Sequence, residues 1–170
     1  MSDETTLRIS LGHSLAYHRL HAQDDGRSVP GIVFLSGFKS DMRGIKATWL
    51  ADWCAKSGRA FVRFDYRGHG ESTGSFADLG IGDWAADACH VIDQLTEGPQ
   101  ILVGSSMGGW IALLLARLRP ESIAGLVGIA AAPDFTEGLL RSRLTAEQLE
   151  AIELEGRVEV PSQYSDDPYI

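Results

Sequence analysis

A serine between two glycines stands at the end of an apolar segment. Residues 101–103 are Ile-Leu-Val, and they lead directly into Gly104-Ser105-Ser106-Met107-Gly108, which has the spacing G-x-S-x-G. This pattern is typical of a sharp turn between a strand and a helix that presents its central serine as a nucleophile. Side chains at positions 104 and 108 would collide with neighbouring backbone, and we expect a strained backbone at Ser106. The alternative interpretation is an ordinary glycine-rich turn with an exposed serine.

A serine nucleophile also needs hydrogen-bond donors for the oxyanion that forms when it attacks a carbonyl group. The N–H of Met107 is one candidate, because it follows the serine and begins the next helix. The second donor is expected in the loop after an earlier strand, and residues 36–41 follow the apolar segment 31–35. We therefore predict the Phe38 N–H as the second donor, with Gly37 allowing close approach. Alternatively, Gly37 simply ends the strand.

The segments around the serine alternate between strand and helix patterns. Four apolar runs have the length of buried strands: 31–35, 60–64, 100–103 and 124–130. Three amphipathic segments lie between them and predict helices: 46–56, 83–95 and 107–119. The first helix is expected to bury Trp49, Leu50, Trp53 and Cys54. Right-handed crossovers give a mostly parallel sheet with helices on both faces, and alternating apolar residues within 7–20 add an antiparallel hairpin in front. The predicted fold class is α/β.

These motifs resemble the α/β-hydrolase superfamily, with residues 104–108 as its nucleophile turn and 36–38 as its oxyanion loop. Residues 65–72 (DYRGHGES) are similar to the D-x-R-G-x-G-x-S turn found after the next strand. Four runs resemble the α/β-hydrolase domain-containing protein 10 subfamily more narrowly: 34–38, 62–66, 98–110 and 160–165. The resemblance extends from about Leu7 to the last residue. It implies a serine esterase or thioesterase, and its animal members are mitochondrial enzymes that hydrolyse acyl glucuronides and S-acylated proteins.

The resemblance further implies a catalytic acid and then a histidine later in the chain than the serine. All five histidines, however, precede Ser106. We interpret the chain as stopping before the last strands, the acid and the base. Segment 1–132 is then the N-terminal part of the hydrolase core, 133–164 a lid and 165–170 a truncated tail. Strand 124–130 becomes an apolar sheet edge without charge or proline, which favours self-association.

The remaining histidines and acids are not assigned to the reaction. His69 follows strand 60–64, at the same end of the sheet as Ser106, but the favoured interpretation is a structural residue that hydrogen-bonds Asp65 or backbone. Three aspartates follow the serine, in the expected lid and tail, and none is assigned as the catalytic acid: Asp134, Asp166 and Asp167.

No metal site or cofactor is predicted. His13, His18 and His21 have a spacing that invites a metal site, but strand geometry places His18 and His21 on opposite faces of the sheet. The glycine-rich segment 70–82 matches neither of the common phosphate-binding patterns, so nucleotide binding has little support.

Composition excludes several other classes of function. The chain has 170 residues and a net charge of −8, which is unfavourable for binding nucleic acid or anionic membranes. Its apolar runs fall short of the roughly 18 residues of a membrane span. Two cysteines, Cys54 and Cys89, and the acidic start Met1-Ser2-Asp3-Glu4 favour a cytoplasmic protein without an organellar leader. The mitochondrial location of the animal subfamily members is therefore not expected to carry over.

The predicted function is that of a cytoplasmic serine hydrolase. It cleaves a small carboxylic ester or thioester through an acyl-enzyme on Ser106, with the base and the acid beyond residue 170. Apolar residues of 133–164 would line an acyl pocket. The alternative is a non-catalytic binding module of the same fold or an inactive fragment, and a third possibility keeps the fold but changes the reaction, as in cofactor-free perhydrolases. The 170-residue chain alone is expected to be weakly active or inactive.

Overall fold

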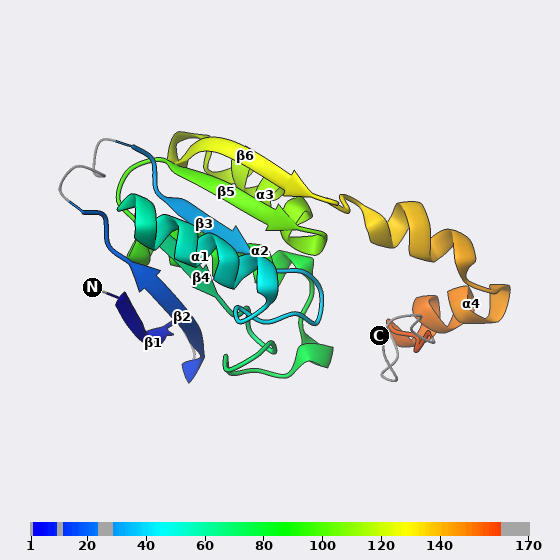
Figure 1. Ribbon diagram of the computed structural model, residues 1–170. Coiled ribbons are helices and arrows are strands. Elements are labelled where there is room, and N and C mark those ends of the chain that lie inside the picture. Colours follow the sequence, from blue (N-terminus) through cyan, green and yellow to red (C-terminus); the bar gives the residue numbers. More distant parts are fainter. Residues whose placement is uncertain (1, 10–11, 24–28, 161–170) are drawn as a thin grey trace. The chain divides into compact units, whose positions relative to one another are not determined.

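A computed structural model describes residues 2–9, 12–23 and 29–160, with side chains from Thr6 onwards (Figure 1). The chain divides into two compact units, with the boundary in the sequence between Pro133 and Asp134. The first unit contains the sheet and the serine turn. The second contains the segment predicted as a lid, and this role stays a prediction.

The first unit is built on a six-stranded sheet in the order β1-β2-β4-β3-β5-β6. The strands are β1 (Ser2–Arg8), β2 (Ser14–Leu20), β3 (Ile32–Leu35), β4 (Phe61–Phe64), β5 (Gln100–Ser105) and β6 (Ile123–Ile129). β1 and β2 form the antiparallel hairpin, with Leu7 opposite Leu15, and β2 is also antiparallel to β4. The other neighbouring strands are parallel. The predicted mixed α/β sheet with an N-terminal hairpin is confirmed.

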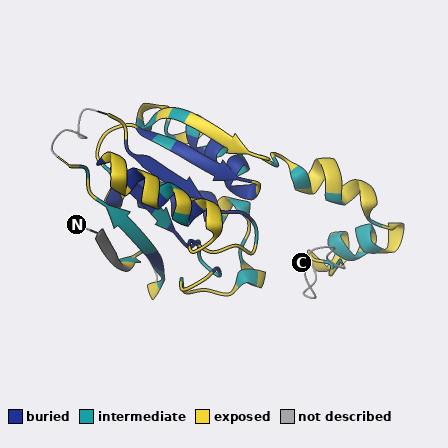
Figure 2. Cartoon of the chain, viewed as in Figure 1, coloured by how far each residue is buried: buried dark blue, intermediate teal, exposed yellow. Residues whose placement is uncertain are grey.

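Helices cover both faces of this sheet (Figure 2). They are α1 (Ile45–Ser57), α2 (Ile81–Leu95) and α3 (Met107–Leu118), and the short 3-10 turns η3 (Phe76–Asp78) and η4 (Pro120–Ser122) lie in the connections. Val33 and Leu35 of β3 pack in a core cluster with α2 and α3, whereas Ile32 and Phe34 pack in a second cluster with α1. Because successive side chains of a strand point to opposite faces, the two clusters lie on opposite sides of the sheet.

The buried side of α1 differs from the prediction. Trp49 and Trp53 are 65% and 42% exposed, and of the expected face only Cys54 is buried. The helix contacts the sheet through Ala47, Ala51 and Cys54. These small side chains let the helix backbone lie close to the strands. Leu50 of the predicted face also packs against the second core cluster, so the prediction was wrong for the two tryptophans and not for the whole face. Large aromatic residues dominate a hydrophobic pattern over alanine.

The second unit contains the π-helical turn η5 (Thr136–Leu140), the 3-10 turn η6 (Arg141–Arg143) and α4 (Ala146–Glu155). Thr145 Oγ1 accepts from the Gln148 N–H at 3.2 Å, and Gln148 Oε1 accepts from the Thr145 N–H at 2.9 Å. This reciprocal pair fixes the start of α4. The end of the predicted lid, 161–164, and the predicted tail, 165–170, lie outside the described residues. In the described part of the chain, every helix is too short or too polar to span a bilayer.

Candidate active site

Ser106 lies at the turn between β5 and α3 and is exposed between buried neighbours. Its backbone has φ 52° and ψ −115°, and a residue with a side chain rarely adopts such a positive φ. Hydrogen bonds hold this conformation from both sides. The Ser106 N–H donates to the Ile129 carbonyl at 3.0 Å, and the Ser106 carbonyl accepts from the N–H groups of Gly109 and Ala132 at 2.9 and 3.1 Å. The strained backbone predicted for the serine is therefore present.

The two glycines of the turn are required by close backbone contacts. A Cβ atom on Gly104 would overlap the carbonyl group of Gly108, and a Cβ atom on Gly108 would overlap the carbonyl oxygens of Leu35 and Ser36. The first turn of α3 thus lies directly against β5 and the end of β3, where no side chain fits. This contact is the physical basis of the G-x-S-x-G spacing.

The loop after β3 lies beside the serine turn. A Cβ atom on Gly37 would be 3.6 Å from the Ser106 Cβ and 3.4 Å from the Ser105 carbonyl oxygen. Met107 is the first residue of α3, so its N–H has no partner within the helix. The backbone at Gly37, directly before Phe38, therefore lies beside the serine turn from which α3 starts. That the N–H groups of Phe38 and Met107 bind an oxyanion stays a prediction.

The Phe38 side chain anchors this loop to the core. Its ring packs edge-on against Phe76, with centroids 5.0 Å apart, and against Trp84, with centroids 6.1 Å apart. Phe76 and Trp84 are themselves stacked at 5.5 Å. Phe38 is thus held by aromatic residues that follow β4 and begin α2.

Buried Asp65, the first residue after β4, ties two loops together. Its carboxylate accepts from the Met42 N–H at 2.6 Å, in the loop after β3, and from the Glu71 N–H at 2.9 Å, in its own loop. Burial raises the pKa of Asp65 above its ordinary value, and these two hydrogen bonds offset the shift only in part. The backbone of the loop after β3 is therefore attached to the loop after β4 through one carboxylate.

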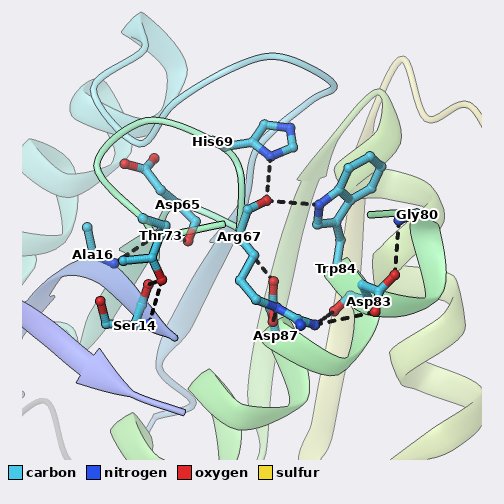
Figure 3. A network of polar contacts seen from close by, with 11 residues as sticks. Ser14, Ala16, Asp65, Arg67, His69, Thr73, Gly80, Asp83, Trp84 and Asp87 are labelled. Carbon is cyan, nitrogen blue, oxygen red and sulfur yellow. Dashed lines mark hydrogen bonds and ion pairs between the residues drawn. The ribbon is translucent and has the colours of Figure 1, made fainter. Parts of the chain in front are cut away.

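Arg67 connects the same loop to α2 (Figure 3). Its Nε donates to Asp87 Oδ1 at 2.7 Å, and its backbone N–H donates to Asp87 Oδ2 at 2.9 Å. Its carbonyl oxygen accepts from Trp84 Nε1 at 3.1 Å. Burial raises the pKa of Asp87 above its ordinary value, and the hydrogen bonds from Arg67 offset the shift only in part. Sequence reasoning missed Asp87, although an acid on the apolar side of α2, three residues after Trp84, was a usable signal.

His69 is 4% exposed, and both of its ring nitrogens have backbone partners. Nε2 accepts from the Lys39 N–H at 3.3 Å, and Nδ1 lies 3.2 Å from the Arg67 carbonyl oxygen. The predicted bonding of His69 to backbone is found. With both nitrogens engaged, His69 is not placed to act as a general base for Ser106. Among the described residues, no group of three or more His, Cys, Asp or Glu side chains is arranged to hold a metal ion.

The mixed sheet and its strained serine turn have the architecture of an α/β-hydrolase. Within this class, the family described as "Serine aminopeptidase, S33" matches residues 28–162, and the chain belongs to that family. The comparisons therefore support a hydrolase, and they confirm the resemblance to the α/β-hydrolase domain-containing protein 10 subfamily drawn from the motifs.

Three similar proteins illustrate the relationship. A protein of Rattus norvegicus named "Palmitoyl-protein thioesterase ABHD10, mitochondrial" is 43% identical over 92% of this chain and 50% of its own length. The solved structure of mouse alpha/beta hydrolase domain-containing protein 10 is 41% identical, with a TM-score of 0.83 over 95% of this chain and 62% of that one. A putative hydrolase from Agrobacterium vitis is 36% identical, with a TM-score of 0.86 over 99% and 67% of the two chains. The chain spans about half the length of the curated relatives it matches.

The predicted cytoplasmic location is wrong by this comparison, because relatives from four mammals are all named mitochondrial. The prediction rested on the acidic start of the sequence and on cysteines without disulfides, and Cys54 and Cys89 are indeed free. Free cysteines argue only against an oxidising compartment such as the secretory pathway, and therefore do not single out the cytoplasm.

Proposed function

We propose that this chain provides the nucleophile and the oxyanion hole of a serine hydrolase that cleaves carboxylic esters or thioesters. The observation that carries the proposal is the exposed serine in a strained turn at the N-terminus of α3, next to the loop of Gly37. Ser106 Oγ attacks the carbonyl carbon of the acyl group. The N–H groups of Phe38 and Met107 bind the resulting oxyanion, which the positive end of the α3 dipole also favours.

Two further groups complete the reaction. A base takes the proton of Ser106, collapse of the tetrahedral intermediate releases an alcohol or thiol, and water then releases the acid from the acyl-enzyme. All five histidines precede Ser106, and His69 has both nitrogens engaged. We therefore assign the base and the catalytic acid to sequence beyond residue 170. The relatives, about twice as long as this chain, support that assignment.

The substrate class follows from the same relatives. The rat relative is named a palmitoyl-protein thioesterase, which supports an acyl thioester or ester as the substrate of the whole protein. Residues 133–164 are proposed to form its lid. A non-catalytic binding module of the same fold is the second candidate function, favoured by His69, whose two ring nitrogens are both engaged with backbone groups.

A fluorophosphonate probe separates these candidates, because it reacts with activated serines. We expect the whole protein, in which a base beyond residue 170 activates Ser106, to be labelled faster in its native form than after heat denaturation, with the adduct mapped to Ser106 by mass spectrometry. Ser106→Ala should abolish labelling. Ser105→Ala is the matched control, because it removes the neighbouring hydroxyl of the same turn and should still be labelled. Labelling of native protein no faster than denatured protein would favour the binding module, and undiminished labelling of Ser106→Ala would refute the nucleophile.

We also propose that the 170-residue chain associates with itself through β6. This strand pairs with β5 on one side and is the last in the sheet order, and it exposes Leu126, Val127 and Ile129 by 41%, 48% and 37%. Val127 and Ile129 further line an apolar groove with Trp49 of α1. An apolar outer strand without charge or proline is a template for pairing with another strand.

Sedimentation velocity tests this association at micromolar concentrations. We expect dimers or larger species for the wild type and a largely monomeric Val127→Lys, because a lysine on an edge strand opposes pairing. Leu113→Lys, which places the same charge on an exposed apolar position of α3, should associate like the wild type. A monomeric wild type, or equal association of both variants, would argue against β6 as the interface.

A further inference from the structure

We propose that His69 is a positioning residue, which in one neutral tautomer holds the oxyanion loop next to Ser106. The inference rests on the proposed function, because it concerns the loop that supplies the Phe38 N–H. It is independent of the general base, since both ring nitrogens of His69 are engaged with backbone groups.

The two partners of the imidazole define its protonation. The Lys39 N–H can only donate, so Nε2 must present a lone pair to it at 3.3 Å. The Arg67 carbonyl can only accept, so Nδ1 must carry the proton in the 3.2 Å contact. Only the neutral Nδ1–H tautomer satisfies both partners. A protonated ring would direct a second N–H at the Lys39 N–H, and the loop would lose its acceptor.

The loop needs such a contact because its backbone is strained. Lys39, which directly follows Phe38, has a φ of 51° although it carries a side chain. A positive φ of this kind costs about 1–3 kcal/mol and persists only where surrounding contacts compensate. The hydrogen bond to His69 is made by the strained residue itself, and it thereby helps to set the direction of the preceding N–H of Phe38.

The imidazole ring is fixed by the aromatic residues that also hold Phe38. Its centroid lies 5.2 Å from Phe76 and 5.1 Å from Trp84, and Tyr66 lies 5.7 Å away on its own loop. The carbonyl oxygen beside Nδ1 is the same one that accepts from Trp84 Nε1 (Figure 3). His69 and Phe38 therefore share two aromatic neighbours, and neither ring can shift without disturbing the other.

The charged groups around His69 are engaged elsewhere. From the loop after β3, the Lys39 ammonium lies 5.4 Å above the Phe76 ring. From the loop of His69 itself, the Asp65 carboxylate accepts from backbone N–H groups and Glu71 pairs with Arg43 at 3.0 Å. From α2, the carboxylates facing this loop are bound to Arg67: those of Asp83 and Asp87. Among the described residues, no carboxylate hydrogen-bonds to the imidazole.

The protonation of His69 then depends on burial. Burial lowers the pKa of His69, and the hydrogen bond to the Arg67 carbonyl opposes this shift only in part. Because the pKa is lower in the folded protein, the stabilising contact is complete above the ordinary histidine pKa of about 6.5 and is lost as the pH falls through the lowered value. The oxyanion loop is thus expected to be ordered at neutral pH and to loosen in acid.

Two variants at this position test the proposal. His69→Gln keeps an acceptor near the place of Nε2 but cannot be protonated, and His69→Phe keeps a ring of similar size without an acceptor. One readout is NMR, through the tautomer of His69 from its ring ¹⁵N shifts and the pH titration of the Lys39 amide. The other is the rate of fluorophosphonate labelling at Ser106.

We expect the wild type to show the Nδ1–H tautomer and a Lys39 amide transition below pH 6.5. His69→Gln should remove that transition while retaining labelling to within about threefold, and His69→Phe should lower the labelling rate about tenfold or more, because a displaced oxyanion donor loses transition-state stabilisation. An Nε2–H tautomer, or an unperturbed Lys39 amide in His69→Phe, would overturn the proposal. These labelling rates are measured on the whole protein, which includes the base. If neither the whole wild-type protein nor its variants are labelled at Ser106, the proposed function fails, and the NMR titration still decides the role of His69.

Discussion

Asp87→Ala is expected to lower the free energy of unfolding by about 3 kcal/mol or more, because breaking a buried ion pair leaves the partner charge uncompensated. Asp87 is fully buried, and its carboxylate accepts hydrogen bonds from the side-chain Nε–H and the backbone N–H of Arg67. Breaking such pairs costs about 3–5 kcal/mol, and we expect a loss near the lower value. The Arg67 side chain is 17% exposed and its Nη2 also lies 3.6 Å from Asp83 Oδ1, so its charge keeps some compensation in the variant. Urea unfolding followed by circular dichroism measures the change.

The matched control for this substitution lies on the same helix. Asp93 pairs with Arg119 at 3.6 Å, and both side chains are more than two-fifths exposed. Exposed pairs of this kind contribute about 0–1 kcal/mol, so Asp93→Ala should be nearly neutral. Equal decreases in the free energy of unfolding for Asp87→Ala and Asp93→Ala would show that the buried Arg67–Asp87 pair stabilises the fold no more than an exposed pair does.

Gly108→Ala is expected to destabilise the protein by about 3 kcal/mol, a large effect for one added methyl group, because the new atom overlaps backbone rather than a movable side chain. The clash is with the carbonyl oxygens of Leu35 and Ser36, at the end of β3 and the start of the oxyanion loop. Relief of the overlap must move α3 or this loop. Labelling of Ser106 should therefore be lost even at temperatures where the variant remains folded.

Gly82→Ala provides the comparison for a glycine without such a contact. It lies in the first turn of α2, and a Cβ atom there meets nothing within 4 Å. Replacing glycine by alanine at a compatible helical site stabilises by about 0.4–1 kcal/mol, chiefly by reducing the entropy of the unfolded chain. Thermal unfolding of both variants should give shifts of opposite sign. A neutral Gly108→Ala would mean that the turn tolerates displacement of α3.

Much of the fold could be predicted from patterns along the chain. The helices and the other strands of the first unit were expected at their observed places to within a few residues, because they have an apolar period or a short buried run bounded by glycine or proline. The exception is β1 (Ser2–Arg8), which begins five residues before the alternating segment predicted from Leu7. Gly58, for example, ends α1 with a φ of 67°. The buried side of α1 was not predictable in this way, since Ala47 and Ala51 contact the sheet by being small, a property that a hydrophobicity pattern does not record.

For the candidate site, the local pattern G-x-S-x-G was sufficient to place Ser106 in a strained turn, because the clash that demands both glycines arises within one strand, one turn and one helix start. The contacts that support the neighbouring loop were not visible in any local pattern. Lys39 and His69 are 30 residues apart, Met42 and Asp65 are 23 apart, and Arg67 and Asp87 are 20 apart. Such pairs meet only after parallel strands align their carboxyl ends at one edge of the sheet. The chain's own motifs thus define the class of protein and its nucleophile, whereas the support of the oxyanion loop depends on packing between segments that are distant in the sequence.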